Sequence, residues 1–274
     1  MKDDILKMTT TPNHPDDGES PFALEPLLVS EAGPHWEPLA RRAAALRARD
    51  AELATCVPLS QRESRAELAH RHEAEASFLI EGEVADEGAI ARSREALEIL
   101  AQHPYLSAAG LARAHERLMA GYVVARPGQF RSGYVSVGRH VPVSPGAIGR
   151  CLDHCEKTYA RAGRVSRLIG AAAGHHRLSW VHPFVDGNGR IARAATRARL
   201  MAELSCADLW ALSEQLLARR DDYLRLMALA DEPRRGDRDG RGNLSEERLA
   251  GLINFFFDCI ESAQDALLAE VMTG

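Results

Sequence analysis

Residues 182–193 read HPFVDGNGRIAR, and this stretch decides how the rest of the chain is interpreted. Pro183 should end the helix before it, because a residue that precedes proline is disfavoured in helical conformation. DG at 186–187 and NG at 188–189 are consecutive turn dipeptides. A helical pattern restarts after them over about 188–204. We therefore expect two helices joined by a glycine-rich turn that leads into the N-terminus of the second.

The residue types in this stretch suit phosphate chemistry. A glycine-rich turn at a helix N-terminus directs several backbone N–H groups toward one point and forms an anion site. Arg190 and Arg193 share one face of the first helical turn, where the helix dipole disfavours cations, so an anion should compensate them. Asp186 could hold a divalent ion against phosphate oxygens. His182 is the side chain best suited to proton transfer near neutral pH. These are the components that phosphoryl-type transfer requires.

Taken alone, the DGNG turn would more often be a plain helix–loop–helix connection with a buried histidine. The complete string, however, resembles the Fic signature H-x-F-x-[D/E]-[G/A]-N-[G/K]-R-x-x-R without a gap. The resemblance implies an all-α Fic fold and transfer of AMP from ATP to a Ser, Thr or Tyr hydroxyl of a protein target. The roles that it implies are His182 as general base, Phe184 as a core anchor, Asp186 as the Mg²⁺ ligand, Gly187, Asn188, Gly189 and Arg190 around the phosphates, and Arg193 on the γ-phosphate.

Position 189 separates branches of the family that the chain resembles. The phosphate-transferring Doc branch has lysine where this chain has Gly189, so the glycine favours the AMP-transferring branch. A relative that transfers phosphocholine also carries the signature. A nucleotide-binding regulatory module without turnover is the alternative that is not an enzyme.

A second motif lies upstream, at residues 77–82, which read SFLIEG. By itself it is the end of a helix capped by Gly82. Beside a complete Fic signature it resembles the family's inhibitory motif [S/T]-x-x-x-E-[G/N], which comprises Ser77, Glu81 and Gly82. The resemblance implies that Glu81 pairs with Arg193 and so denies it to the γ-phosphate. In some relatives the same glutamate also removes AMP again, so a bifunctional enzyme is an alternative.

The pattern along the chain is almost entirely helical. We expect a disordered tail over 1–22, an N-terminal helical region over 23–105 with the inhibitory helix at about 60–82, a Fic core over 106–230, and a loop and helix over 231–274. Ser60 and Ser245 are the expected N-caps of the inhibitory helix and the last helix. The predicted helices are 36–53, 60–81, 87–101, 107–120, 146–161, 165–181, 188–204, 207–230 and 245–271.

Residues 122–143 are the exception to the helical pattern. They are rich in Val and Tyr and are broken by Pro and Gly, which is typical of a β-hairpin. We interpret the hairpin as a surface flap beside the active site. In proteins that the chain resembles, such a flap pairs with an extended target segment, so we expect a protein target to dock on about 129–143.

The other candidate ligand residues also have a purely structural interpretation. Tyr223 could stack on adenine, but a partly buried core tyrosine is the more common outcome. His175 and His176 lack metalloprotease spacing and are expected to be structural. Cys151, His154 and Cys155 share a helix face but lack a fourth ligand, so they too are expected to be free of metal.

Composition limits the partners and the compartment that the protein can be expected to have. The 274 residues carry a net charge of −5 and give a pI of about 6.1, which does not favour a nucleic-acid partner. No apolar run approaches the roughly 18 residues of a membrane span, and the N-terminus lacks an apolar signal segment. Five scattered cysteines indicate a reducing compartment. We expect a cytoplasmic protein, with a homodimer as one possible assembly.

Overall fold

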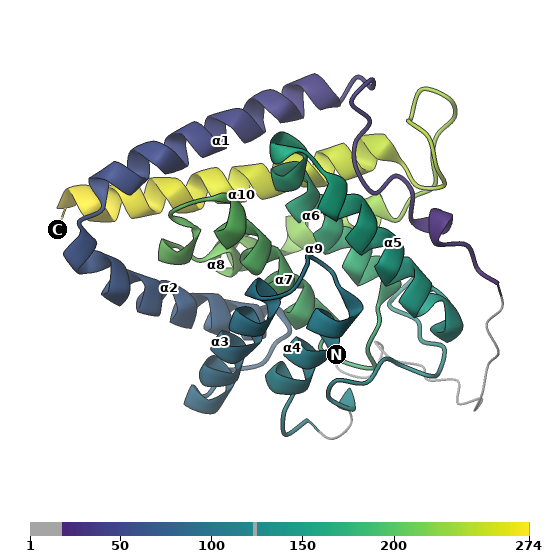
Figure 1. Cartoon of the computed structure of the whole chain (residues 1–274), viewed down its shortest axis with the longest axis horizontal. Helices are drawn as coiled ribbons and strands as arrows, with labels where there is room; N and C mark the ends of the chain where they lie inside the picture. The colour runs from purple at the N-terminus through teal and green to yellow at the C-terminus, as the bar shows by residue number, and fades with distance from the viewer. Residues whose placement is uncertain (1–17, 123–124, 274) are drawn as a thin grey trace.

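The computed structural model describes residues 18–122 and 125–273 (Figure 1). Most of the predicted tail, residues 1–17, therefore lies outside the described residues. The first described element is a short 3-10 helix, η1 (Pro21–Leu24), whose Leu24 is fully buried. The architecture of the described residues is all-α, as predicted.

Helix bounds agree with the predicted ranges to within a few residues, except near 207–230. The α-helices are α1 (Trp36–Cys56), α2 (Leu59–Ile80), α3 (Glu87–Ala101), α4 (Ala108–Leu118), α5 (Ile148–Arg161), α6 (Arg164–Val181), α7 (Asn188–Glu203), α8 (Leu212–Ala218), α9 (Arg220–Ala230) and α10 (Glu246–Thr273). Two further 3-10 turns are η3 (Pro145–Ala147) and η4 (Ala207–Leu209).

The single helix predicted over 207–230 is wrong: the chain forms η4, α8 and α9 instead. Side chains from distant segments satisfy the backbone groups at the first break. Arg197 of α7 donates to the carbonyl oxygen of Trp210. Glu73 of α2 accepts from the backbone N–H of Ser213 at 2.9 Å and from its hydroxyl at 2.5 Å. These contacts replace intrahelical bonds, so the helix stops and restarts.

The expected helix caps were partly confirmed. Ser60 is not an N-cap, because α2 already begins at Leu59 after Pro58, which offers no side-chain cap. Gly82 has φ of +76° directly after α2, the left-handed conformation that a C-terminal glycine supplies. Ser245 caps α10 by accepting from the backbone N–H of Arg248 at 3.1 Å.

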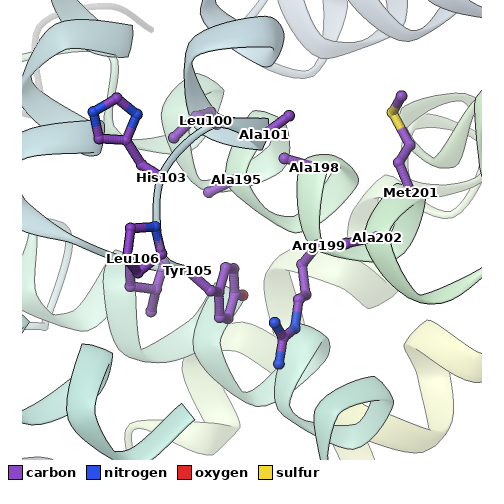
Figure 2. A pocket seen from close by; sticks show the side chains of 11 residues that line it. Leu100, Ala101, His103, Tyr105, Leu106, Ala195, Ala198, Arg199, Met201 and Ala202 are labelled. Atoms are coloured by element: carbon purple, nitrogen blue, oxygen red, sulfur yellow. The ribbon is translucent and has the colours of Figure 1, made fainter. Parts of the chain in front are cut away.

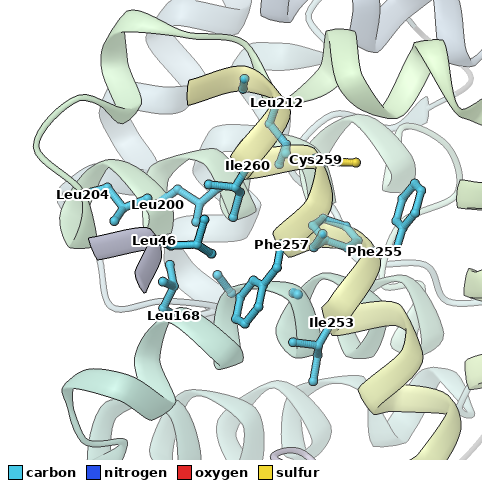
Figure 3. Close-up of a cluster of buried hydrophobic side chains, with 14 of the residues drawn as sticks. Leu46, Leu168, Leu200, Leu204, Leu212, Ile253, Phe255, Phe257, Cys259 and Ile260 are labelled. Atoms are coloured by element: carbon cyan, nitrogen blue, oxygen red, sulfur yellow. The ribbon is translucent and has the colours of Figure 1, made fainter. Parts of the chain in front are cut away.

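Helix α6 runs through the middle of the molecule and positions the site. Its N-terminal half packs into a core with α1, α8 and α10, part of which Figure 3 shows. Its C-terminal half packs into a second core with α3, α4, α5 and α7. Helices α1 and α10 lie side by side along one edge of the molecule (Figure 1). The C-terminal end of α6 is therefore held from several sides at the point where the signature begins.

The structure does not show the β-hairpin predicted over 122–143. In the described part of that segment the strand-like features are isolated bridge residues, namely an antiparallel bridge between Val137 and His140 and a bridge residue at Tyr134. Arg131 explains why no ladder forms, since its guanidinium takes the carbonyl oxygens of Gly133 and Val143. Side-chain donors thus satisfy backbone groups that would otherwise pair across a hairpin. Residues 123–124 lie outside the described residues.

The described chain offers no candidate for a bilayer crossing, because none of its helices is both long and apolar enough. The five cysteines are all free thiols, and Cys151, Cys155, Cys206 and Cys259 are buried.

Candidate active site

His182 stands at the C-terminal end of α6 in a left-handed conformation, with φ of +49°. Its backbone N–H still binds the carbonyl oxygen of Leu178 at 3.0 Å, so the helix ends at this residue. Burial lowers the pKa of the imidazole to about 4, with Arg131 and His140 contributing in the same direction. The imidazole is therefore neutral at pH 7 and able to accept a proton.

The backbone carbonyl of Ser179, one turn earlier in α6, acts in the opposite direction and favours the protonated ring, but burial outweighs it. A neutral imidazole has one unprotonated nitrogen, which is the acceptor that a general base requires.

Asn188 closes the turn that follows. Its side-chain oxygen accepts from the backbone N–H of Phe184 at 3.0 Å, and its side-chain nitrogen donates to the Phe184 carbonyl at 2.8 Å. Gly187 has φ of +76°, and a Cβ at this position would lie 2.6 Å from the sulfur of Met119. Both conformation and space therefore require glycine there. The DG dipeptide at 186–187 lies in the turn, as predicted, but the NG turn predicted at 188–189 is wrong, because Asn188 and Gly189 are the first two residues of α7.

His115 is a support of this turn that sequence reasoning missed. The ring of Phe184, which is fully buried as predicted, stacks on His115 with centroids 3.7 Å apart. The Nδ1 atom of His115 accepts from the backbone N–H of Gly128 at 3.0 Å. Its Nε2 atom therefore carries the proton and donates to the carbonyl of Asp186 at 2.9 Å. No local pattern around His115 announces this role, because its partners come from two distant segments.

Asp186 presents a half-exposed carboxylate at the mouth of the turn. One oxygen accepts from the backbone N–H of Gly187 at 2.7 Å. The described residues contain no group of three or more His, Cys, Asp or Glu side chains that could hold a metal by themselves. One carboxylate oxygen is nevertheless the donor set with which Mg²⁺ is commonly held when substrate phosphates and water complete the octahedron. The residues present therefore fit a nucleotide-bound Mg²⁺.

Arg190 is fixed between two aromatic rings. Its guanidinium lies 4.9 Å from the ring centroid of Phe78 and 5.0 Å from that of Tyr122. It also pairs with Glu83 at 3.2 Å. Only 3% of the residue is exposed. The sequence assigned Arg190 to the phosphates, and the structure gives it contacts on both faces of its plane.

Arg193 meets the end of α2 through hydrogen bonds. Its Nε donates to the hydroxyl of Ser77 at 2.8 Å, and one terminal nitrogen donates to the Ser77 carbonyl at 2.8 Å and to Glu81 Oε1 at 2.7 Å. Arg220 donates to the carbonyl of Ile80 at 2.9 Å and so fixes the last turn of α2. The predicted contact between Glu81 and Arg193 is present.

Glu81 also covers the start of α7. A Cβ placed on Gly189 would overlap Glu81 Oε1. Helix α7 has no side-chain cap at its N-terminus. The Glu81 carboxylate therefore occupies the position in which an anion would meet both the first turn of α7 and Arg193. Burial alone would raise the pKa of Glu81, but Arg193 outweighs it and holds this pKa below its usual value.

Tyr223 is buried close to Arg193 and also borders the cleft that the signature residues line. Only 3% of the residue is exposed, and its hydroxyl lies 2.7 Å from His175 Nε2. His175 Nδ1 lies 2.9 Å from the hydroxyl of Thr196, which itself donates to the Ala192 carbonyl. The order of donors is thereby fixed: His175 Nδ1 donates to Thr196, and Tyr223 donates to His175 Nε2. Burial raises the pKa of Tyr223, and the charge of Arg193 acts in the opposite direction.

Two further histidines have carboxylate partners. His176 Nε2 pairs with Asp231 at 2.9 Å, and His154 pairs with Glu25 at 2.7 Å. Cys151 and Cys155 are buried thiols.

The signature residues line one cleft of about 400 Å³, together with Glu81 and side chains of α9. His182, Asp186, Gly189 and Arg193 all border it. A second cavity of about 320 Å³ lies between the outer face of α7 and the α3–α4 connection, with Tyr105 and Arg199 among its lining residues (Figure 2). None of the residues of 182–193 lines that second cavity. The chemistry of the signature is therefore gathered in the first cleft.

Comparison with known proteins agrees with this site. Residues 105–200 match the Fic/DOC family. The chain is 31% identical to Protein adenylyltransferase Fic of Drosophila mojavensis over 104 residues, which cover 37% of this chain and 21% of that protein. It is 33% identical to the protein of the same name from Drosophila melanogaster over 89 residues, which cover 32% and 18%. The matches span about a fifth of the length of these relatives.

Solved structures share the fold over most of the chain. A Fic family protein from Desulfovibrio desulfuricans G20 superposes with a TM-score of 0.66 at 18% identity, covering 84% of this chain and 74% of that one. A fragment of Fic-1 from C. elegans gives a TM-score of 0.61 at 18% identity and covers 86% and 74%. The fold and the signature agree with this family match, and residues 105–200 of the chain are a region similar to the Fic/DOC family.

Proposed function

We propose that this protein transfers AMP from ATP to a Ser, Thr or Tyr hydroxyl of a protein target. The observation that carries the proposal is the convergence of three groups on one cleft. They are the neutral imidazole of His182, the uncapped N-terminus of α7, and the guanidinium of Arg193. Similar proteins that bear the name adenylyltransferase support the same reaction.

His182 takes the proton of the target hydroxyl on the unprotonated nitrogen of its neutral ring. The hydroxyl oxygen then forms a bond to the α-phosphorus of ATP, the bond from that phosphorus to the bridging oxygen breaks, and pyrophosphate leaves. A neutral imidazole suits this role, since a protonated ring could not accept the proton. Backbone N–H groups of the first turn of α7 face the phosphate chain and stabilise its charge.

Asp186 would hold Mg²⁺ against the phosphates through the carboxylate oxygen that does not bind Gly187. The ion would supply charge neutralisation to the phosphate oxygens. Arg193 would fix the γ-phosphate once Glu81 leaves it. The remaining assignments stay predictions, namely a target docked along 129–143, a homodimer and a cytoplasmic location.

Glu81 would inhibit the same chain that carries it. Its carboxylate competes for Arg193 and for the space above Gly189. A Cβ at position 189, which the lysine of the Doc branch would add, would overlap Glu81 Oε1 unless that carboxylate moved. The side chain of Glu81 is 39% exposed and can move toward solvent. The Arg193 guanidinium that it leaves is buried and needs another anion, which the γ-phosphate would supply.

The test uses the full chain, ATP and Mg²⁺ in a cell lysate, followed by mass spectrometry for AMP on hydroxyl side chains. Glu81→Gly should increase the number of modified sites, and Glu81→Gly combined with His182→Ala should give none. A protein that binds ATP but modifies nothing in either background would instead be a regulatory module. Transfer from CDP-choline in place of ATP would assign the phosphocholine reaction. Loss of AMP from a modified target only when Glu81 is present would add the reverse reaction.

A further inference from the structure

Arg131 is a buried cation in the segment that was predicted to form the hairpin, and only 3% of it is exposed. Its side chain donates to four backbone carbonyls. Two belong to the end of α6: Nε donates to His182 at 2.7 Å and Nη2 donates to Val181 at 3.2 Å. Two belong to its own segment: Nη1 donates to Gly133 at 3.1 Å and Nη2 donates to Val143.

The carbonyls of Val181 and His182 need a donor from outside the helix. The last carbonyls of an α-helix have no intrahelical partner. His182 adopts φ of +49° without being glycine, a conformation that persists only where its surroundings hold it. Arg131 supplies donors on both sides of that peptide. The backbone N–H of Arg131 also binds the carbonyl of Pro183 at 2.9 Å, so three successive carbonyls, those of residues 181–183, are held by one residue.

The other hydrogen bonds of Arg131 hold residues 133–143. The carbonyls of Gly133 and Val143 mark the two ends of a stretch that includes the bridge between Val137 and His140. The Nε2 atom of His140 lies 2.8 Å from the carbonyl of Trp180, on the same last turn of α6. The side chain of Arg131 therefore binds both the end of α6 and residues 133–143. The His140 ring of this second segment also contacts α6.

We propose that Arg131 is a positioning residue that holds His182 in the orientation for proton transfer and registers residues 133–143 against it. The part of this proposal that concerns the rate rests on the proposed function. The part that concerns the placement of the imidazole does not. A planar guanidinium with several fixed donors can serve four carbonyls at once, which an ammonium group cannot do.

The positioning role of Arg131 depends on its hydrogen bonds, and its charge is additional support. Three charged or titratable groups shift the pKa of His182, namely Arg131 and His140, which lower it, and Glu81, which raises it. After burial, Arg131 is the largest cause that lowers the pKa of His182, while Glu81 acts in the opposite direction. Replacing Arg131 by a neutral residue should therefore raise that pKa toward its ordinary value.

The experiment titrates the His182 imidazole by NMR in histidine-labelled full chain and measures AMP transfer in the Glu81→Gly background. For Arg131→Gln we expect the His182 pKa to rise by about half a unit or more. For Arg131→Lys, which keeps the charge but loses donors, we expect little change in that pKa. Both variants should lower the rate at saturating ATP by roughly 10-fold or more, with the KM for ATP changed less than about 2-fold.

Arg197→Gln is the matched control, because Arg197 is also buried and also binds backbone carbonyls, those of Asp208 and Trp210. It should lower the melting temperature without moving the His182 pKa or selectively lowering the rate.

The proposal is overturned if folded Arg131→Gln keeps both the wild-type His182 pKa and the rate of Glu81→Gly alone. If Arg131→Gln fails to fold, Arg131→Lys decides: an unchanged rate overturns the proposal. If Glu81→Gly itself transfers nothing, the proposed function fails, and the NMR titration still decides the placement.

Discussion

The two arginines of the signature sit three residues apart on α7 and are held in different ways. Arg190 is stacked between the rings of Phe78 and Tyr122, with Glu83 at its edge. Arg193 is held by hydrogen bonds to Ser77 and Glu81, and no ring among the described residues stacks on it. A stacked guanidinium keeps its place whether or not its carboxylate is present. A guanidinium held by a half-exposed carboxylate can change partners, which makes Arg193 the position at which control is possible.

The largest effect should come from removing each carboxylate in turn. Glu81→Ala should increase AMP transfer by about 10- to 100-fold, since a charge-assisted contact contributes roughly 1.5–3 kcal/mol. Glu83→Ala is the matched control and should change the rate less than about 3-fold, because the two rings still hold Arg190. Initial rates at saturating ATP measure both. Equal increases in the rate of AMP transfer for Glu81→Ala and Glu83→Ala would show that Arg190 and Arg193 are not held in different ways.

A smaller effect is expected on the free energy of unfolding, which should differ between substitutions at two neighbouring residues of α2. Phe78→Leu removes a ring from Arg190 and volume from the core, and we expect it to lower the free energy of unfolding by about 2 kcal/mol. Ser77→Ala removes one hydrogen bond from Arg193, and we expect a loss of about 1 kcal/mol. Urea unfolding followed by circular dichroism measures both. A larger loss for Ser77→Ala would mean that hydrogen bonds, and not stacking, dominate at this end of α2.

The smallest effect should appear in the pH dependence of the Glu81 contact. The pKa of Glu81 is held below its usual value of 4.5, net of burial. The contact therefore stabilises the fold at pH values above about 4.5, and this contribution is lost as the pH falls through the lower, folded-state pKa. Since Glu81 is more than a third exposed, we expect less than about 1 kcal/mol.

The measurement for this third prediction is the difference in unfolding free energy between His182→Ala and the double variant His182→Ala with Glu81→Gln, from pH 7 to pH 3, because Glu81 also raises the pKa of His182. The buried imidazole of His175, whose pKa is lowered to about 3 by burial, destabilises both proteins equally below about pH 6.5 and cancels in the difference. The difference should be flat to about pH 4.5 and then shrink. A difference that grows as the pH falls would contradict the contact.

Local signals explain what could be predicted from the sequence. Pro183, the DG dipeptide and Gly82 act through their own backbone preferences, so the turn and the end of α2 were predictable, whereas the NG dipeptide is helical in α7. The helical periodicity was equally local. The motif spacing predicted that Glu81 meets Arg193, because the resemblance to the family supplied the long-range contact.

Long-range side chains explain the rest. The helix over 207–230 breaks where Arg197 and Glu73, from other helices, take its backbone groups. The hairpin is replaced because Arg131 takes its carbonyls. The support of the turn by His115 depends on two segments that no spacing rule connects. Such contacts are decided by tertiary packing and leave no periodic trace in the sequence.

The most direct test of the central claim follows the phosphorus atoms of ATP. The Glu81→Gly protein is incubated with a lysate and ATP labelled at either the α- or the γ-phosphate, with the His182→Ala double variant alongside. We predict stable protein labelling from the α-label only, and none when His182 is absent. Labelling from the γ-phosphate, or labelling that survives loss of His182, would contradict the claim that this cleft directs a hydroxyl to the α-phosphorus.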